Sequence, residues 1–485
     1  MKKYKIENLL HSKGYVSIET LIVAGLIIAT GAFLISKLVL KGKDVANSNN
    51  KNMATAGKTM DDNSFSNNIP TDSSSQIQEA KHIVKNPSEL SDFDYAIIDD
   101  NYINGELKKI DEMVSQGAIP FAPPPEVINY MKTPIQKLKE FKGGIIITGY
   151  HGNKADIEIP SYIDGKEVKV IAPMAFTPKP PTQSELKEKN YIPEPPKGKL
   201  KSVKLPNTLK FIGEDAFAFN QLTNIAIPDS VTEIGRGAFQ NNNLTSIKLS
   251  GNLIRIEPST FSDNKLKSVI IPDSVVEVGS SAFQNNNLTS IKLGSNLNKI
   301  EDFAFSNNKL ESVTIPDSII EINEGVFSSN NLKSIKLGSN LKIIGTWAFS
   351  DNKLELVTIP DSVTEINGFA FSNNNLKSIK LGSNLKKIEK FAFSKNKLES
   401  VTIPDSVVEI EELVFESNEL KSIKLGSNLK RIGDFAFSGN KLESVIVPNN
   451  VTYLGCDVFG DNPLKKKIIP KNCEEAKLPT PKVYK

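Results

Sequence analysis

The residue types that carry most enzyme chemistry are scarce in this 485-residue chain. It contains three histidines (His11, His82 and His151) and two cysteines (Cys456 and Cys473). The sequence has no glycine-rich phosphate loop, no nucleophile elbow and no metal-ligand spacing. We therefore expect no catalytic residue, no metal site and no cofactor, and we interpret the protein as non-enzymatic.

Both cysteines lie near the C-terminus, and the repeats before them contain none. A disulfide between Cys456 and Cys473 would stabilise this end of the chain by about 3 kcal/mol if it is unstrained. Two free thiols are the alternative, since disulfides persist only in an oxidising compartment.

One carboxylate near the N-terminus lies where a charge is costly. Residues 1–14 are basic, and residues 20–36 carry no charge over a length close to the ~20 residues that span a bilayer. Glu19 lies at the start of this apolar run, where a carboxylate is destabilising unless it has a partner. We therefore expect Glu19 to have a function.

The segment from Gly14 through Tyr15 to Glu19 resembles the type IV prepilin signal, in which a basic leader ends in Gly and a Glu follows at the fifth position. The resemblance implies that a prepilin peptidase cleaves between Gly14 and Tyr15. It also implies that Glu19 pairs with the N-terminal amine of a neighbouring pilin subunit. Residues 1–14 would then be a leader peptide, and residues 15–43 a pilin-like transmembrane helix. A plain signal anchor or a cleaved secretory signal peptide is the alternative.

The next region changes character before the repeats begin. Residues 44–78 are rich in Asn, Ser, Asp and Thr, which indicates a flexible linker. Residues 79–142 indicate a small helical or mixed module that is broken by the proline-rich segment 121–126. Short helices are predicted over 78–86, 105–114 and 134–141.

A strict internal period is the strongest signal in the sequence. A Phe recurs every 22 residues, an Asn follows each one by three positions, and a Leu follows by five. This pattern predicts stacked coils that bury their apolar residues against one another. We expect the Asn column to be buried and to satisfy backbone groups of neighbouring coils. The phenylalanines are Phe217, Phe239, Phe261, Phe283, Phe305, Phe327, Phe349, Phe371, Phe393, Phe415, Phe437 and Phe459.

The unit Leu244-Thr-Ser-Ile247-Lys248-Leu249 resembles the strand of a leucine-rich repeat. Alternation along this strand directs Ile247 and Leu249 to the core and Lys248 to solvent. The copies of IPDSVTEIGRGAF (227–239) resemble BspA-type leucine-rich repeats in particular. This resemblance implies an α+β chain: a leucine-rich-repeat β-solenoid of about 13 coils, preceded by the N-terminal pilin-like helix.

The solenoid is predicted to span residues 143–465, beginning with a capping coil over 143–176. Residues 177–199 are proline-rich and are expected to form a surface insertion. Residues 466–485 are expected to form a C-terminal cap and tail.

Charged residues also fall into columns along the repeats. One column alternates in sign from Glu311 through Lys333 to Glu443, and another does so from Glu233 to Arg431 except at Ile343. Stacked coils would place these opposite charges side by side, so we interpret both columns as structural.

A third column is not self-neutralising. The outward strand position carries a lysine in every second coil, at intervals of about 10 Å. Since the strand-lined face of a solenoid commonly binds ligands, we interpret this basic stripe as a candidate site for an extracellular protein or a polyanionic glycan. Simple solvation of the strands is the alternative. The lysines are Lys248, Lys292, Lys336, Lys380 and Lys424.

Proteins with BspA-type repeats are commonly surface proteins that bind host or matrix components, so the resemblance implies an adhesin. Together with the prepilin-like signal, it predicts a bacterial cell-surface or extracellular protein displayed as a minor or tip pilin-like subunit. Its partners would be prepilin peptidase, other pilin subunits, the membrane, and a host, matrix or recipient-cell ligand. The alternative is a membrane-anchored repeat protein with an envelope or biofilm structural role and no pilus.

Overall fold

The computed structural model describes residues 90–115, 123–178, 198–469 and 474–475, which belong to two compact units. The first unit contains the described residues between 97 and 143, and the second contains all the others. The prepilin-like segment with Gly14, Tyr15 and Glu19 lies outside the described residues, as does Cys473.

The first unit is a pair of helices, α4 (Asp100–Ser115) and α5 (Pro125–Lys137), and α5 continues into a short 3-10 helix, η2 (Leu138–Phe141). Ile103 and Ile110 of α4 are buried where α4 packs against α5. The expected helices over 105–114 and 134–141 lie within these elements. However, α5 begins at Pro125, inside the segment expected to break the chain, because proline fits the first turn of a helix.

No helix among the described residues combines the length and apolar character needed to cross a bilayer.

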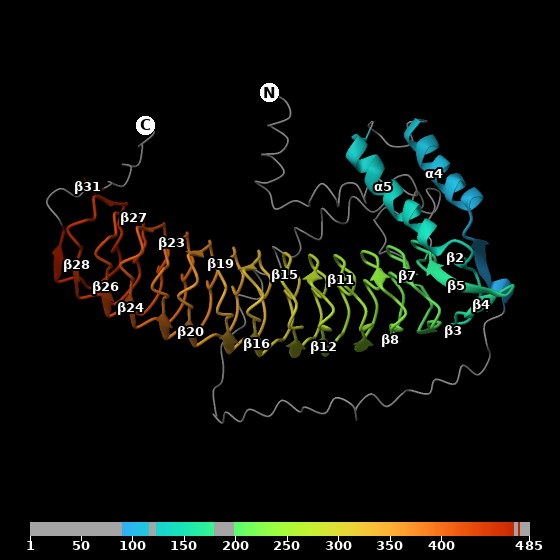
Figure 1. Ribbon diagram of the computed structural model, residues 1–485. Helices are drawn as coiled ribbons and strands as arrows, with labels where there is room; N and C mark the ends of the chain where they lie inside the picture. The colour runs from blue at the N-terminus through green and yellow to red at the C-terminus, as the bar shows by residue number, and fades with distance from the viewer. Residues whose placement is uncertain (1–89, 116–122, 179–197, 470–473, 476–485) are drawn as a thin grey trace, which may run out of the picture. The chain divides into compact units, whose positions relative to one another are not determined.

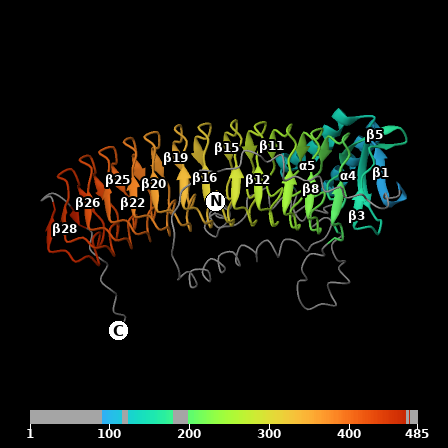
Figure 2. The same ribbon diagram turned by 90° about the horizontal axis from the view of Figure 1, so that it is seen from below.

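The second unit is the solenoid, in which two rows of parallel strands run along opposite edges of the stacked coils (Figure 1). One row consists of three-residue strands, and we call its outward side the strand face. Seen from below, these strands follow one another along the unit (Figure 2). They are β3 (Asp156–Glu158), β6 (Ser202–Lys204), β8 (Asn224–Ala226), β10 (Ser246–Lys248), β12 (Ser268–Ile270), β14 (Ser290–Lys292), β16 (Ser312–Thr314), β18 (Ser334–Lys336), β20 (Leu356–Thr358), β22 (Ser378–Lys380), β24 (Ser400–Thr402), β26 (Ser422–Lys424), β28 (Ser444–Ile446) and β30 (Lys466–Ile468).

The other row, the short-strand row, consists of two-residue strands. They are β7 (Phe211–Ile212), β9 (Glu233–Ile234), β11 (Arg255–Ile256), β13 (Glu277–Val278), β15 (Lys299–Ile300), β17 (Glu321–Ile322), β19 (Ile343–Ile344), β21 (Glu365–Ile366), β23 (Lys387–Ile388), β25 (Glu409–Ile410), β27 (Arg431–Ile432), β29 (Tyr453–Leu454) and β31 (Glu474–Glu475).

The N-terminal end of this unit adds η1 (Leu90–Asp92), β1 (Phe93–Ile97), β2 (Ile145–Tyr150), β4 (Tyr162–Ile163) and β5 (Lys166–Ile171). Strand β1 extends the sheet that runs β1-β2-β5-β7-β9. The solenoid therefore uses residues that the sequence analysis placed in the helical module. At the C-terminal end β30 lies just beyond residue 465, where the solenoid was predicted to end. The described residues contain fourteen three-residue strands, and about 13 coils were expected.

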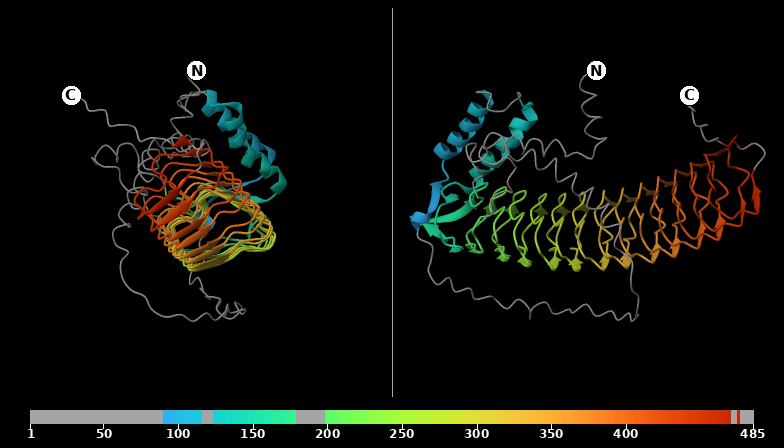
Figure 3. Two further views of the ribbon diagram at one scale, coloured as in Figure 1. Left: turned by 90° about the vertical axis from the view of Figure 1, so that its left-hand side faces the viewer. Right: turned by 180° about the vertical axis from the view of Figure 1, so that it is seen from behind.

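The phenylalanine column forms a continuous ladder through the core. From Phe217 to Phe459, successive ring centroids lie 5.3–5.7 Å apart and the rings are within 2–16° of parallel. The rings from Phe217 to Phe437 are fully buried. The end view and the view from behind show how the coils repeat one outline (Figure 3). Aromatic stacking along the unit therefore adds to the burial of Leu and Ile.

The asparagine column binds neighbouring coils together, as predicted. Asn330 Oδ1 accepts a hydrogen bond from the backbone N–H of Leu310 at 3.0 Å, and its amide donates to the carbonyl of Phe305 at 3.0 Å. The same amide donates to the carbonyl of Phe327 in its own coil at 3.2 Å. Each of these Asn side chains therefore satisfies backbone groups that the turn leaves without partners.

Candidate binding surface

The basic stripe lies on the strand face with all five lysines exposed. Lys336 is the register partner of Thr314, and Lys380 is the partner of Thr358. None of the five lysines forms an ion pair within the part of the chain that the structure describes. The structure thus places the five candidate residues Lys248, Lys292, Lys336, Lys380 and Lys424 in one row on one surface.

An acidic row flanks the basic stripe, which the sequence analysis did not anticipate. Asp317 accepts hydrogen bonds from the backbone N–H of Ser339 at 2.7 Å and from its hydroxyl at 3.0 Å. These two bonds, with a smaller contribution from the Lys336 ammonium, lower the pKa of Asp317. Asp273, Asp361 and Asp405 make the corresponding contacts in other coils. A ligand on the stripe therefore meets ammonium groups beside fixed carboxylates.

The strand face is divided into pairs of coils. Strand β16 pairs with β18, and β20 pairs with β22, but no strand pairing joins β18 to β20 among the described residues. Ile335 in the second strand of a pair is only half-buried, whereas Val313 in the first strand is buried. Each stripe lysine lies on the second strand of its pair, so the stripe has one lysine per pair of coils.

The two sign-alternating columns are structural, as predicted. On the strand face Lys333 contacts Glu311 at 3.3 Å, within one strand pair. In the short-strand row Lys299 contacts Glu277 at 3.0 Å and Glu301 at 2.8 Å. The hydrogen bonds that the Lys299 ammonium donates to Glu301 and Glu277 raise the pKa of Lys299. These side chains already have ion-pair partners within the chain.

The structure also shows an apolar column that the sequence analysis missed. It lies two residues before each core Phe, at a backbone position with φ between 46° and 59° in every coil from Asp215 to Asp457. Five consecutive coils carry a large apolar residue there, and we call this set the aromatic ridge. Aromatic residues two positions before the core Phe were its signal in the sequence. The ridge consists of Trp347, Phe369, Phe391, Leu413 and Phe435.

Asp215, at the N-terminal end of the same column, and its chain neighbour Glu214 have perturbed carboxyl pKa values. Burial and the nearby Glu214 carboxylate raise the pKa of Asp215 to about 7, although a hydrogen bond from Gln240 Nε2 at 2.7 Å opposes the shift. Burial also raises the pKa of Glu214. Among the described residues no group of three or more His, Cys, Asp or Glu could hold a metal ion.

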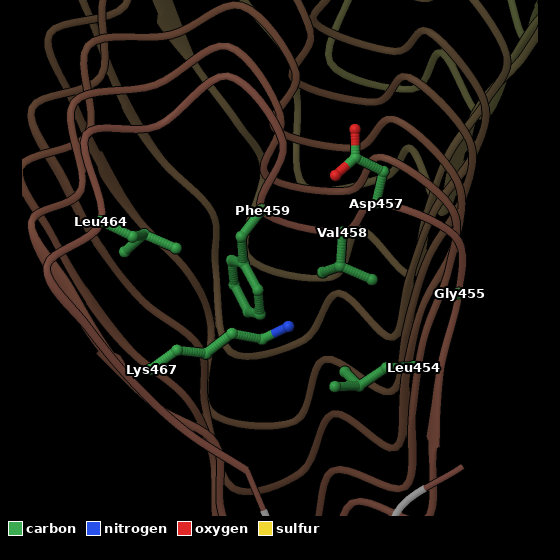
Figure 4. Close-up of a pocket in the computed structure, with 7 residues that line it drawn as sticks. All are labelled: Leu454, Gly455, Asp457, Val458, Phe459, Leu464 and Lys467. Atoms are coloured by element: carbon green, nitrogen blue, oxygen red, sulfur yellow. The ribbon is translucent and has the colours of Figure 1, made fainter. Parts of the chain in front are cut away.

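A cavity of about 320 Å³ lies at the C-terminal end of the solenoid (Figure 4). Leu454, Val458 and Phe459 line it, and the Lys467 ammonium lies 5.9 Å from the centroid of the Phe459 ring. These apolar side chains belong to the last coil of the core, so we assign the cavity to the end of the stack rather than to a ligand.

Cys456 lies half-buried near the same end and forms no disulfide within the described residues. Its predicted partner, Cys473, lies outside them.

The profile of BspA type leucine rich repeat regions matches residues 196–285, 255–377 and 364–478, which together make up more than half of the chain. No curated protein matches the sequence.

Several solved structures resemble the chain. A leucine-rich repeat protein from Bacteroides ovatus is 24% identical with a TM-score of 0.55, and the match covers 69% of this chain and 86% of that protein. A leucine rich cell surface protein from Faecalibacterium prausnitzii is 21% identical, with a TM-score of 0.38 and coverage of 68% and 85%. The pneumococcal vaccine antigen PcpA is 21% identical, with a TM-score of 0.40 and coverage of 67% and 91%. The first of these matches shows the solenoid fold.

Proposed function

The chain belongs to the BspA type leucine rich repeat family, and from this premise we propose that it is a non-enzymatic adhesin of the bacterial surface whose solenoid binds an extracellular ligand. The resemblance of the repeats to this family supports both the surface location and the binding role. A solenoid also suits this role because it offers a long, regular surface on which one set of contacts recurs.

The basic stripe is the observation that carries the proposal. Its five lysines are exposed and have no ion-pair partner among the described residues, while lysines of the neighbouring column are paired with glutamates. An extended ligand with repeated acidic groups, either a polyanionic glycan or an acidic protein segment, would contact several of these lysines at once. Because each single contact is weak, the affinity would depend on how many coils the ligand spans.

Binding of the full-length protein to immobilised heparin tests this role, with neutral dextran as the reference surface. Replacing all five stripe lysines with Gln is expected to abolish heparin binding. The control removes five lysines that recur with the same period at the turn before the strand. If both variants lose binding equally, total charge is responsible and the stripe is not the site. The control lysines are Lys265, Lys309, Lys353, Lys397 and Lys441.

We propose in addition that the N-terminus displays the solenoid on a pilus, as a minor or tip subunit. The sequence from Gly14 to Glu19 and the uncharged run over 20–36 support this proposal. The partners would be prepilin peptidase, other pilin subunits and the membrane. The competing proposal is a membrane-anchored repeat protein with an envelope or biofilm role and no pilus.

The N-terminus and mass of the mature protein from native cells separate these proposals. An N-terminal Tyr15 is the result expected for prepilin processing. An intact Met1 would contradict it and favour the anchored protein. The heparin experiment does not depend on this outcome, so display and binding can fail separately.

A further inference from the structure

The aromatic ridge is a second surface, separate from the basic stripe. It lies at the corner that follows the short-strand row, four residues after the outward residue of each strand. Trp347 is 39% exposed, and Phe369, Phe391, Leu413 and Phe435 are half-buried. The rings of Phe369 and Phe391 stack at 4.5 Å, and Trp347 lies 5.8 Å from Phe369. Trp347, Phe369 and Phe391 therefore form a continuous stack, and with Leu413 and Phe435 on the next two coils the ridge is about 20 Å long.

The backbone at this position is left-handed. Trp347, Phe369, Phe391 and Leu413 have φ between 54° and 58°, a left-handed conformation in which bulky residues are strained. Of the other coils, one places an isolated Phe303 at the same position, and the rest place Asp215, Gly237, Ser259, Ser281, Gly325 or Asp457 there. The fold does not require a large side chain here, and five in succession expose apolar surface that suits an interface.

The charges beside the ridge have a self-complementary order. The outward residues of β19, β21, β23, β25, β27 and β29 run along one flank of the ridge. If this series of six residues is aligned with a second copy of itself running in the opposite direction, each charged residue lies opposite a residue of the other sign. The two uncharged residues, which stand at the ends of the series, then lie opposite each other. The series is Ile343, Glu365, Lys387, Glu409, Arg431 and Tyr453.

We propose that the aromatic ridge is a dimerisation surface, on which a second copy of this chain docks in antiparallel orientation with the two-fold axis between Phe391 and Leu413. In this register Lys387 faces Glu409 of the second copy, and Glu365 faces Arg431. These contacts would add to the ion pairs that Lys387 and Arg431 make within their own chain. Ile343 faces Tyr453, so the uncharged ends of the series also meet. A register centred on Phe391 itself would place Lys387 against Lys387 and is disfavoured.

The size of the ridge explains why the flanking charges matter. A stable interface buries roughly 800 Å² on each partner, more than one line of five side chains provides. The charged row must therefore be covered together with the ridge. The apolar ridge would supply the buried centre, and the charges would select the antiparallel register, as is usual for a polar rim.

Sedimentation of the full-length chain in density-matched detergent over a wide concentration range tests the proposal. The emission of Trp347, the only tryptophan, reports on the ridge in the same samples. We expect a reversible dimer whose formation shifts Trp347 emission to shorter wavelength. Phe391→Ser, which installs a residue type found elsewhere in this column, is expected to weaken the dimer at least ~10-fold.

Charge variants provide a second test of dimerisation that remains valid if Phe391→Ser also destabilises the fold. Lys387→Glu is expected to weaken the dimer, and the double variant Lys387→Glu with Glu409→Lys to restore it. Lys299→Glu is the control. Lys299 occupies the same strand position as Lys387 and, like it, contacts two glutamates, but it lies outside the ridge.

A chain that stays monomeric at every concentration would overturn the proposal and leave the ridge as a stabilising ladder only. A dimer that is insensitive to Phe391→Ser and Lys387→Glu, with unchanged Trp347 emission, would overturn it as well, because association would then use another part of the chain.

Discussion

Asn374 accepts a hydrogen bond through Oδ1 from the backbone N–H of Leu354, on the preceding coil, at 3.1 Å. The Asn374 side chain is 6% exposed, and its amide donates to the carbonyl of Phe349 at 2.9 Å. One side chain thus joins two coils through both of its polar atoms. The same contact recurs along the ladder, so the stability of the solenoid depends on a column of amides as well as on its apolar core.

Replacing Asn374 with Ala is expected to destabilise the solenoid by about 3 kcal/mol, because it leaves buried backbone donors and acceptors without partners. Chemical denaturation followed by circular dichroism measures this loss. The neighbouring Asn375 provides the control, since it is half-buried and its backbone N–H alone bonds to Leu354. Equal losses from Asn374→Ala and Asn375→Ala would contradict the structural role of the ladder.

Asp215 predicts a pH-dependent stability. Its folded-state pKa is about 7, raised mainly by burial from an ordinary value of 3.8. Between these two values the folded chain holds the proton that the unfolded chain releases, so stability falls as the pH rises from about 4 to about 7. Asp215→Asn removes this titration, and asparagine tolerates the left-handed backbone at this position.

The Asp215→Asn variant is therefore expected to match the natural chain near pH 4 and to exceed its stability by about 2–4 kcal/mol above pH 7. Denaturation midpoints at several pH values give the comparison. Asp351→Asn, at an exposed position with φ of 55°, is the control. A stability gain for Asp215→Asn that does not vary with pH would rule out titration of this carboxyl as its cause.

Substituting alanine for two different glycines is expected to change stability in opposite directions. A Cβ added at Gly382 would overlap the carbonyl oxygen of Pro360 on the preceding coil, whereas one added at Gly105 in α4 meets no atom within 4 Å. Gly382→Ala is therefore expected to destabilise the solenoid by about 1–3 kcal/mol. Gly105→Ala is expected to stabilise α4 by about 0.5–1 kcal/mol, since alanine is the better helix former.

Hydrogen exchange can follow both glycine variants, because it resolves the two units separately. Faster exchange near Gly382 and slower exchange in α4 are the expected outcomes. A protected, unchanged solenoid in Gly382→Ala would mean that the coils separate more easily than their close contact at Pro360 indicates.

The basic stripe predicts salt-dependent binding to heparin. If the lysines neutralise acidic groups of the ligand, the logarithm of the affinity should fall linearly with the logarithm of the salt concentration. Replacing Lys336 alone with Gln should reduce this slope by roughly one contact. Because Asp317 flanks Lys336, Asp317→Asn should strengthen binding. A slope unaffected by Lys336→Gln would place the ligand elsewhere.

The periodic columns by themselves determined the solenoid, its core and the role of the Asn ladder. Phe, Asn and Leu recur every 22 residues, and only stacked coils give such residues identical surroundings in every repeat. The sign-alternating charges could be predicted for the same reason, since stacking fixes which residues become neighbours. Part of the candidate site, the basic stripe, followed from strand alternation at positions such as Lys336.

Only the tertiary structure decided four other features, because each depends on how the folded chain brings residues together. The coils pair in twos on the strand face, and the sheet recruits β1 from outside the repeats. Asp317 lies beside the stripe, where its carboxylate accepts hydrogen bonds from Ser339 of the next coil. The aromatic ridge could be identified only from the structure, in which the backbone at Trp347 is left-handed and its side chain is partly exposed to solvent. Periodicity thus revealed what the coils share, and the folded chain revealed where they differ.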